Sequence, residues 1–184
     1  MEPVKLESER LLIRPFKIGD EQAMFELNSN PLVQKYTGDT LVTTKEQAED
    51  VFHNTVLKDY EMYGYVRFAV IHKPDQKLIG FTGIKYLPEA NGESDLGYRF
   101  LPEYWGKGIA TESSKMSLKF AFEKLKLKQI YGFAELENSA SKNVLLKVGF
   151  KLDKIDFYPG EEDIPEKKTL QWFVLTKKEY AKTI

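Results

Sequence analysis

The segment Y-W-G-K-G-I-A-T, residues 104–111, has the residue types of a phosphate-binding turn. Gly106 and Gly108 allow the backbone to approach a ligand closely, and they stand where a strand ends and a helix is expected to begin. The first amides of a helix have no intrahelical acceptors, and the helix dipole places partial positive charge beside them. The segment is therefore suited to hold the pyrophosphate of a cofactor.

Two better-known phosphate motifs are missing from the sequence. A Walker A loop requires G-x-x-x-x-G-K-[ST], and a dinucleotide fingerprint requires G-x-G-x-x-G after the first strand of a βαβ unit. Because glycines before a helix also serve as capping and packing devices, the turn needs support from a second motif.

That second motif is N-S-A-S-K-N-V-L-L-K-V-G-F, residues 138–150, which follows the next expected strand. Together, W-G-K-G-I-A-T and N-x-x-S-x-x-x-x-x-K-x-G-F resemble the GNAT superfamily of N-acetyltransferases. The opening L-E-S-E-R-L-L-I-R-P, residues 6–15, is similar to the ribosomal-protein N-terminal acetyltransferase branch of that superfamily. The likeness extends from Leu6 to Leu175.

The resemblance implies an acetyltransferase that uses acetyl-CoA as its cosubstrate and needs no metal. It places the pantetheine arm against the backbone of Phe100 and its neighbours Arg99 and Leu101, where two strands splay apart. It also implies that Asn138 and Asn143 hydrogen-bond the cofactor, although a helix N-cap is an equally good interpretation of Asn138. The residues implied at the pyrophosphate are Gly106, Lys107, Gly108, Ile109, Ala110 and Thr111.

Two positions depart from the superfamily pattern. Trp105 stands where Gln or Arg is usual, so backbone amides must replace one side-chain contact to phosphate. Leu145 stands where many members carry a tyrosine that protonates the leaving thiolate. The resemblance places Ser141 near the thiol, and we take this serine as the substitute acid; a capping or packing role is the alternative.

A base is also required, because an alkyl ammonium must lose a proton before its nitrogen can attack a thioester. The stretch D-L-G-Y, residues 95–98, matches the E-I-G-Y stretch of the family. We therefore expect Asp95 to be the base, either directly or through a water, with Glu93 as the alternative. A surface carboxylate on a strand is the competing interpretation of Asp95.

The elements around these motifs follow from periodicity and turn signals. Thr43-Thr44 with Gln47 indicates a capping box, and Asn91-Gly92 indicates a turn. Helices are expected between Gly19 and Asn30, between Thr44 and Gly64, from Ile109 to Lys124 and from Ser139 to Val148. Strands are expected at 11–15, 66–71, 78–85, 94–101, 129–136, 151–158 and 168–175.

The strand, helix, strand order over residues 94–136 implies a right-handed crossover and a parallel pair in an otherwise antiparallel sheet. The expected fold class is α/β of the α+β type: a GNAT-like mixed, mostly antiparallel central sheet of about six to seven strands flanked by about four helices. No repeat or linker divides the chain, so residues 1–184 are expected to form a single acetyltransferase domain.

Composition argues against several other functions. Lys and Arg total 27 and Asp and Glu 28, which gives a net charge of -1 and no electrostatic excess for binding nucleic acid. The chain has no cysteine, and His53 and His72 lack metal-ligand spacing. No run approaches the roughly 20 apolar residues of a membrane span. Because the first residues also lack a secretory h-region, a cytoplasmic location is expected.

These observations predict direct transfer of an acetyl group from acetyl-CoA to a primary amine, with a protein N-terminal α-amine as one acceptor. A small amine (a polyamine, an amino sugar or an amino acid), a non-catalytic acyl-CoA-binding module and a plain interaction domain remain as alternatives. The first two helices and the 160–166 loop are expected to frame the acceptor side. That loop has four carboxylates, which form either an acidic rim or a solvated hairpin loop. The resemblance is compatible with a homodimer.

Overall fold

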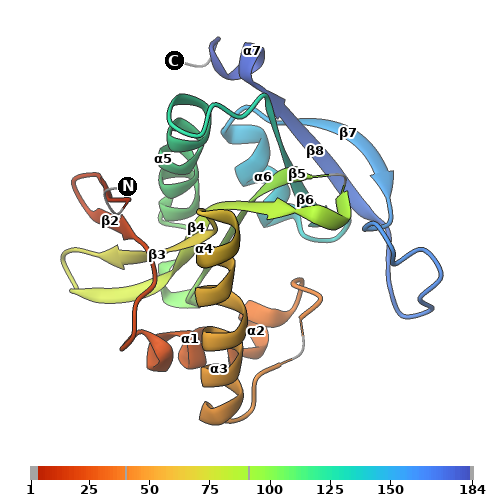
Figure 1. Cartoon of the computed structure of the whole chain (residues 1–184). Helices are drawn as coiled ribbons and strands as arrows, with labels where there is room; N and C mark the ends of the chain where they lie inside the picture. The colour runs from red at the N-terminus through yellow and green to blue at the C-terminus, as the bar shows by residue number, and fades with distance from the viewer. Residues whose placement is uncertain (1–3, 40, 91, 183–184) are drawn as a thin grey trace.

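One mixed sheet with helices on both faces forms the frame of the molecule (Figure 1). The computed structural model describes residues 4–39, 41–90 and 92–182. The strands are β1 (Leu6–Glu7), β2 (Leu11–Arg14), β3 (Arg67–His72), β4 (Lys77–Leu87), β5 (Glu93–Phe100), β6 (Gln129–Glu135), β7 (Lys151–Asp156) and β8 (Leu170–Thr176). The α-helices are α1 (Glu21–Asn28), α2 (Pro31–Gln34), α3 (Lys45–Val51), α4 (Lys58–Tyr63), α5 (Ile109–Glu123), α6 (Ser139–Lys147) and α7 (Lys177–Tyr180).

The sheet is mostly antiparallel, with the strand order β1-β2-β3-β4-β5-β6-β8-β7. Its parallel neighbours are β5 and β6, as the sequence predicts, and their recorded register is the single pair Asp95 with Tyr131. Beyond this pair β5 continues to Phe100 and β6 to Glu135 without pairing to each other. The sheet has eight strands, slightly more than expected, because the two-residue β1 pairs with β2.

Two layers of helices pack against the sheet. On one face, Leu118 and Phe122 of α5 and Leu145 of α6 share a core with Leu96 of β5. On the other face, Met24 of α1 packs with residues of the α3 to α4 region and of β3. Figure 1 shows α5 and α6 on one side of the sheet and α1 to α4 on the other. The sheet therefore lies between two layers of helices, and the buried side chains form three clusters.

The capping box is confirmed: the Thr44 side chain accepts a hydrogen bond from the Gln47 amide, and the Gln47 side chain bonds back. This helix runs through to Gly64, whose positive φ of 74° ends α4. Its middle, Phe52–Leu57, is π-helical, which the apolar spacing did not indicate.

The Asn30-Pro31 pair does more than stop α1. Asn30 accepts a hydrogen bond from the Leu32 amide at 3.0 Å, and Pro31 occupies the first turn of the short helix α2. Asn caps helices well and Pro fits their first turn, so the same two residues end one helix and begin another.

The ends of several strands differ from the expected ranges by one or two residues. The strand β7 ends at Asp156, two residues before the expected end, and the connection to β8 projects from the body of the molecule (Figure 1). Asn91 lies outside the described residues, whereas Gly92 has the positive φ of a turn glycine. Within the described ranges, no helix is both long and apolar enough to cross a membrane.

Candidate active site

A cavity of about 1200 Å³ lies where β5 and β6 separate. Every cofactor-binding residue expected from the sequence lines it, except Leu101 and Lys107, and so do Asp95 and Ser141. Residues of α1 to α4 also contribute to the wall, but none from 160–166 does. The structure therefore brings the two sequence motifs together and keeps the acidic loop outside the cavity wall.

The glycine turn presents free amides to the cavity. Gly106 and Gly108 have φ values of 71° and 74°, and an added Cβ at Gly106 would meet no atom within 4 Å. Among the described residues, no protein group accepts a hydrogen bond from the amides of residues 109–111. Such a helix start is a fitting site for the pyrophosphate of a cofactor.

The N-terminal segment holds this turn in place. The Arg10 guanidinium donates to the Lys107 carbonyl oxygen at 2.8 Å and to the Glu112 carboxylate, also at 2.8 Å. The Ser8 hydroxyl donates to the other Glu112 oxygen at 2.6 Å. The Lys107 side chain itself lies over the Tyr104 ring, 5.3 Å from the centroid. Ser8 and Arg10 thus have a structural role in shaping the turn.

Only every second residue of β5 can present its backbone N–H and C=O groups to the gap between β5 and β6. The Leu101 amide donates to the Ile79 carbonyl oxygen at 2.9 Å, so Leu101 faces β4. Because hydrogen bonding alternates along an antiparallel strand, Arg99 also faces β4, and Tyr98 and Phe100 face the gap. This corrects the expectation that Arg99 and Leu101 offer their backbone to the cofactor.

Trp105 occupies one backbone acceptor on the edge of β5 that faces the gap. Its indole N–H donates to the Phe100 carbonyl oxygen at 2.7 Å. The residue that departs from the family pattern therefore ties the glycine turn to the end of β5. The Phe100 amide is left as the backbone group facing the gap at this position.

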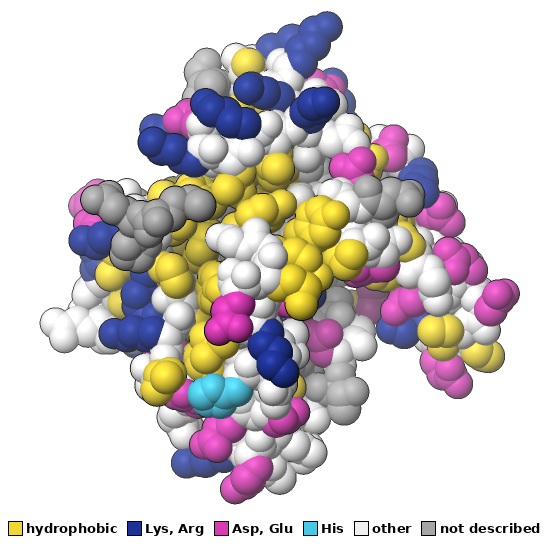
Figure 2. All heavy atoms as spheres, in the orientation of Figure 1, with side chains coloured by type: hydrophobic (Ala, Val, Ile, Leu, Met, Phe, Trp, Pro, Cys, Tyr) yellow, Lys and Arg dark blue, Asp and Glu magenta, His cyan; other side chains and the backbone are white. Residues whose placement is uncertain are grey.

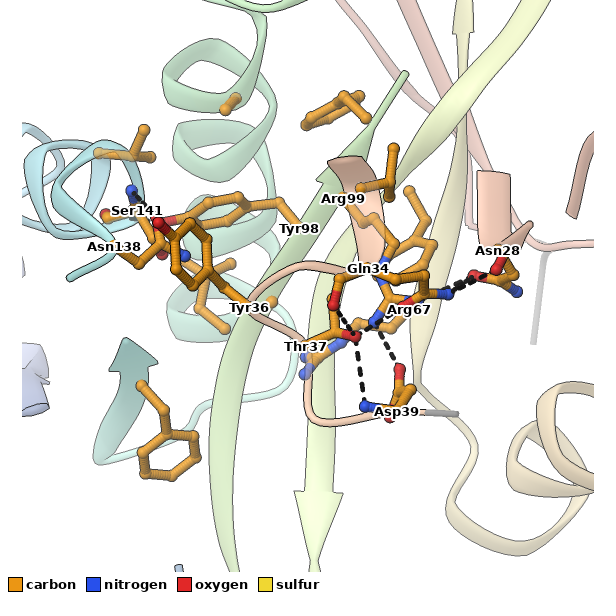
Figure 3. Close-up of a pocket in the computed structure, with 18 of the residues that line it drawn as sticks. Asn28, Gln34, Tyr36, Thr37, Asp39, Arg67, Tyr98, Arg99, Asn138 and Ser141 are labelled. Atoms are coloured by element: carbon orange, nitrogen blue, oxygen red, sulfur yellow. Dashed lines mark hydrogen bonds and ion pairs between the residues drawn. The ribbon is translucent and has the colours of Figure 1, made fainter. Parts of the chain in front are cut away.

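Ser141 is joined to a tyrosine that the sequence analysis left without a role (Figure 3). The Tyr98 hydroxyl donates to the Ser141 carbonyl oxygen at 2.9 Å and lies 3.0 Å from the Ser141 Oγ. Burial raises the pKa of Tyr98 to about 12, so this phenol stays protonated at neutral pH. Asn138 accepts from the Ser141 amide at 3.1 Å, which is an N-cap bond.

Leu145 does not line the cavity. It is 1% exposed, and a Cβ added to Gly132 would lie 2.5 Å from its Cδ2 atom. The position at which many family members carry tyrosine is thus part of the core here. Tyr98 and Ser141, which do line the cavity, carry hydroxyl groups.

Asp95 is buried and paired with an arginine that the sequence analysis missed. Its Oδ2 accepts from Arg67 Nη2 at 2.6 Å, while its buried Oδ1 has no hydrogen-bond partner among the described residues. Arg67 lies across Gly97, where a Cβ would come within 2.4 Å of the guanidinium. A lone arginine in the apolar stretch V-R-F-A-V was the available signal, because buried cations need a partner.

The other carboxylates nearby are engaged elsewhere. Glu93 accepts from the Gln129 side chain at 2.9 Å and does not line the cavity, so the geometry favours Asp95 over Glu93. Tyr158, which lines the cavity, donates to Glu89. Burial, with a further contribution from Glu89, raises the pKa of Tyr158 strongly.

The segment after α2 forms the opposite wall. The Arg99 side chain donates to Asn28 at 2.8 Å and to Asp39 at 2.6 Å, and Thr37 bonds Gln34 at 2.6 Å (Figure 3). These bonds fix residues 34–39 against β5. In the described part of the chain, no cluster of three or more His, Asp or Glu residues is arranged to hold a metal ion.

Comparisons with known proteins agree with this geometry. A family model described as an acetyltransferase (GNAT) domain matches residues 10–151. The uncharacterized N-acetyltransferase p20 of Bacillus licheniformis is 29% identical over 179 residues, covering 96% of this chain and 98% of the relative. The putative ribosomal N-acetyltransferase YdaF of Bacillus subtilis is 27% identical over 105 residues, covering 55% of this chain and 56% of the relative.

Solved structures show the same architecture. A GNAT-family acetyltransferase from Bacillus anthracis has a TM-score of 0.78 at 28% identity, covering 96% of this chain and all 100% of that one. The spermidine N-acetyltransferase of Vibrio cholerae, solved with CoA and spermine, has a TM-score of 0.75 at 18% identity, covering 95% of this chain and 99% of that one. At that identity the second likeness concerns the fold alone.

Proposed function

Because the chain belongs to the GNAT family of acetyltransferases and is an N-acetyltransferase of amines, we propose that the cavity between β5 and β6 is where acetyl-CoA meets the acceptor. Acetyl-CoA supplies the acetyl group as a thioester. The single observation that carries the proposal is the meeting of the glycine turn, the splayed strand edge and Asp95 in one cavity.

The chain would bind acetyl-CoA mainly through backbone groups. The amides of residues 109–111 bind the pyrophosphate, and the backbone of Tyr98 and the Phe100 amide pair with the pantetheine arm. Asn143 lines the cavity on α6 and offers an amide side chain to the same ligand. An amide of the β5 edge polarises the thioester carbonyl, as in an oxyanion hole.

Asp95 receives the proton of the amine. Its Oδ1 is buried and has no partner in the described part of the chain, so it can accept a hydrogen bond from an ammonium or from a water. Arg67 holds the other oxygen, Oδ2, at 2.6 Å and so fixes the orientation of the carboxylate. The amine proton then passes to Asp95 directly or through a water.

Ser141 gives a proton to the leaving sulfur, and Tyr98 holds the Ser141 hydroxyl in position. Both hydroxyls lie on the cavity wall near the end of the splayed edge. The nitrogen–carbon bond forms as the carbon–sulfur bond breaks, the amine proton goes to Asp95, and the sulfur leaves as a thiol. A proton from solvent replaces the one that Ser141 gives.

The first acceptor to consider is a protein N-terminal α-amine, and the second is a small amine. The likeness of residues 6–15 to the ribosomal-protein branch and the relative named as a ribosomal N-acetyltransferase support the former. A relative from Escherichia coli named spermidine N(1)-acetyltransferase, 23% identical over 141 residues, supports the latter.

The test is thermal shift with acetyl-CoA followed by thiol-release assays on N-terminal peptides, polyamines and amino sugars. A ligand at 100 times its dissociation constant stabilises by about 2.7 kcal/mol, so binding is easily seen. Binding without thiol release on any amine would leave a non-catalytic acyl-CoA-binding module, and the absence of a shift would favour a plain interaction domain.

A further inference from the structure

The charges on the cavity wall restrict which amine can enter. Among the described residues, the wall has five basic side chains and three carboxylates. All three carboxylates are already in ion pairs with basic residues of the same wall. The pairs are Asp95 with Arg67 at 2.6 Å, Asp39 with Arg99 at 2.6 Å and Asp59 with Lys85 at 3.7 Å.

The two remaining basic residues have no carboxylate within ion-pair distance in the described part of the chain. Lys147 is on α6, the helix that also carries Asn143, and so belongs to the cofactor end. Lys35 follows α2 on the acceptor side, with its ammonium 4.8 Å from the centroid of the Tyr36 ring. The acceptor side therefore has no surplus of negative charge.

The acidic residues that could have supplied a surplus lie elsewhere. Figure 2 shows acidic side chains on the projecting connection between β7 and β8. No residue from 160–166 lines the cavity, and Glu161 is paired with Lys167 at 2.6 Å. The carboxylates of this loop therefore do not form an acidic wall around the acceptor.

Much of the rest of the acceptor side is apolar. Its wall includes side chains from the segment before α1, from α1, from the segment before α3, from the helix that contains the π-helical segment, and from β6. These are Phe16, Met24, Val42, Val51, Val56 and Phe133. Asn28, Gln34, Thr37 and Thr55 also line the cavity, but their side chains carry no negative charge. Such a wall gains free energy by covering an apolar group and offers no charged partner to an additional cation.

From these observations we infer that the acceptor carries its reactive amine as its one positive charge, on an apolar body, and that polyamines are poor substrates. This inference rests on the proposed acetyl transfer. Asp95 Oδ1, a buried carboxylate oxygen with no hydrogen-bond partner among the described residues, matches one ammonium. A polyamine would bring additional ammonium groups beside Arg67, Lys85 and Arg99, whose carboxylate partners are already used.

The test compares kcat/KM for three acceptors at saturating acetyl-CoA. They are an amidated tripeptide with one α-amine and apolar side chains, the same tripeptide with lysine at its second and third positions, and spermidine. We expect the apolar tripeptide to exceed the other two by at least about tenfold. Equal or higher kcat/KM for spermidine would overturn this inference while leaving acetyl transfer intact. No thiol release from any of the three would overturn the proposed function and this inference with it.

A charge substitution on the acceptor wall tests the same inference without a change of acceptor set. Lys35→Glu places an unpaired carboxylate on the acceptor wall, so the ratio of spermidine to apolar-tripeptide kcat/KM should rise several-fold. Lys119→Glu makes the same charge change on an exposed position of α5 outside the cavity wall and should leave the ratio unchanged. Equal shifts in both variants would attribute the effect to overall charge and contradict the inference.

Discussion

At the scale of single residues, the two oxygens of Asp95 have different surroundings. One is bound by Arg67, and the other is buried without a hydrogen-bond partner among the residues that the structure describes. Burying a carboxylate oxygen without a partner costs stability, so a group in this position is expected to serve a ligand. This asymmetry separates Asp95 from Glu93, whose carboxylate accepts from Gln129.

Asp95→Asn should lower kcat by about 100-fold or more while leaving the Kd for acetyl-CoA nearly unchanged, because the amide still accepts from Arg67 but cannot take up a proton. Steady-state thiol release and calorimetric titration measure the two quantities. Glu93→Gln is the matched control and should resemble the wild type. An unchanged kcat in Asp95→Asn would remove Asp95 from the mechanism.

Tyr98→Phe should lower kcat by about tenfold with little change in the KM for acetyl-CoA, because it removes the hydroxyl that holds Ser141. Ser141→Ala should cost at least as much, and the double variant should cost no more than Ser141→Ala alone. Additive losses would show that the two hydroxyls act separately.

The pair of Tyr98 and Ser141 also predicts how kcat depends on pH in the alkaline range. The pKa of Tyr98 is raised to about 12, so its proton is present at lower pH and is lost only as pH rises through that value. The rate should show no decline due to tyrosine ionisation up to about pH 10. A loss of kcat centred near pH 10 that Tyr98→Phe abolishes would contradict this assignment.

At the scale of elements, the connection between β1 and β2 is joined to α5 through Glu112. Burial alone would raise the pKa of Glu112, but the bonds from Ser8 and Arg10 outweigh burial and lower it. The pKa of Glu112 in the folded protein therefore lies below the ordinary glutamate value of 4.5. The charged carboxylate contributes stability above that value, and the contribution is lost as pH falls through the folded pKa.

Glu112→Gln should accordingly lower Tm at pH 7, and the difference from the wild type should shrink below about pH 4. It should also weaken acetyl-CoA binding, since Arg10 would lose the partner that directs it to the Lys107 carbonyl. Differential scanning fluorimetry across pH measures the first effect. Glu123→Gln, near the other end of α5, is the control and should show no such pH dependence.

Most elements were predictable because their signals are local. Gly108 and Gly64 mark a helix start and a helix end, and the Thr44 capping box has a fixed spacing. The π-helical segment within the helix from Lys45 to Tyr63 could not be predicted, because it depends on packing and not on apolar spacing.

The site was predictable where backbone conformation defines it and not where distant side chains meet. The glycine turn and Asn138 have sequence signatures. The bond between Tyr98 and Ser141 joins residues 43 positions apart, and the ion pair of Asp95 with Arg67 joins residues 28 apart. Only the folded sheet brings these partners into contact.

At the scale of the whole molecule, the chain has the acetyltransferase fold, and its single-domain organisation, its location in the cytoplasm and its oligomeric state remain predictions. The family model covers residues 10–151, and relatives and solved structures extend the likeness to 96% of the chain. The sheet itself is divided at β5 and β6, where a single residue pair is recorded.

That division has a mechanical consequence. Strands β1 to β5 and strands β6 to β8 form two panels that share almost no backbone bonds, so a bound pantetheine arm would serve as a spacer strand between them. Hydrogen–deuterium exchange should therefore show slower amide exchange at Phe100 and its neighbours when CoA is present. The two parts of the sheet would then be most rigidly joined while acetyl-CoA is bound, and they would become more mobile each time CoA dissociates.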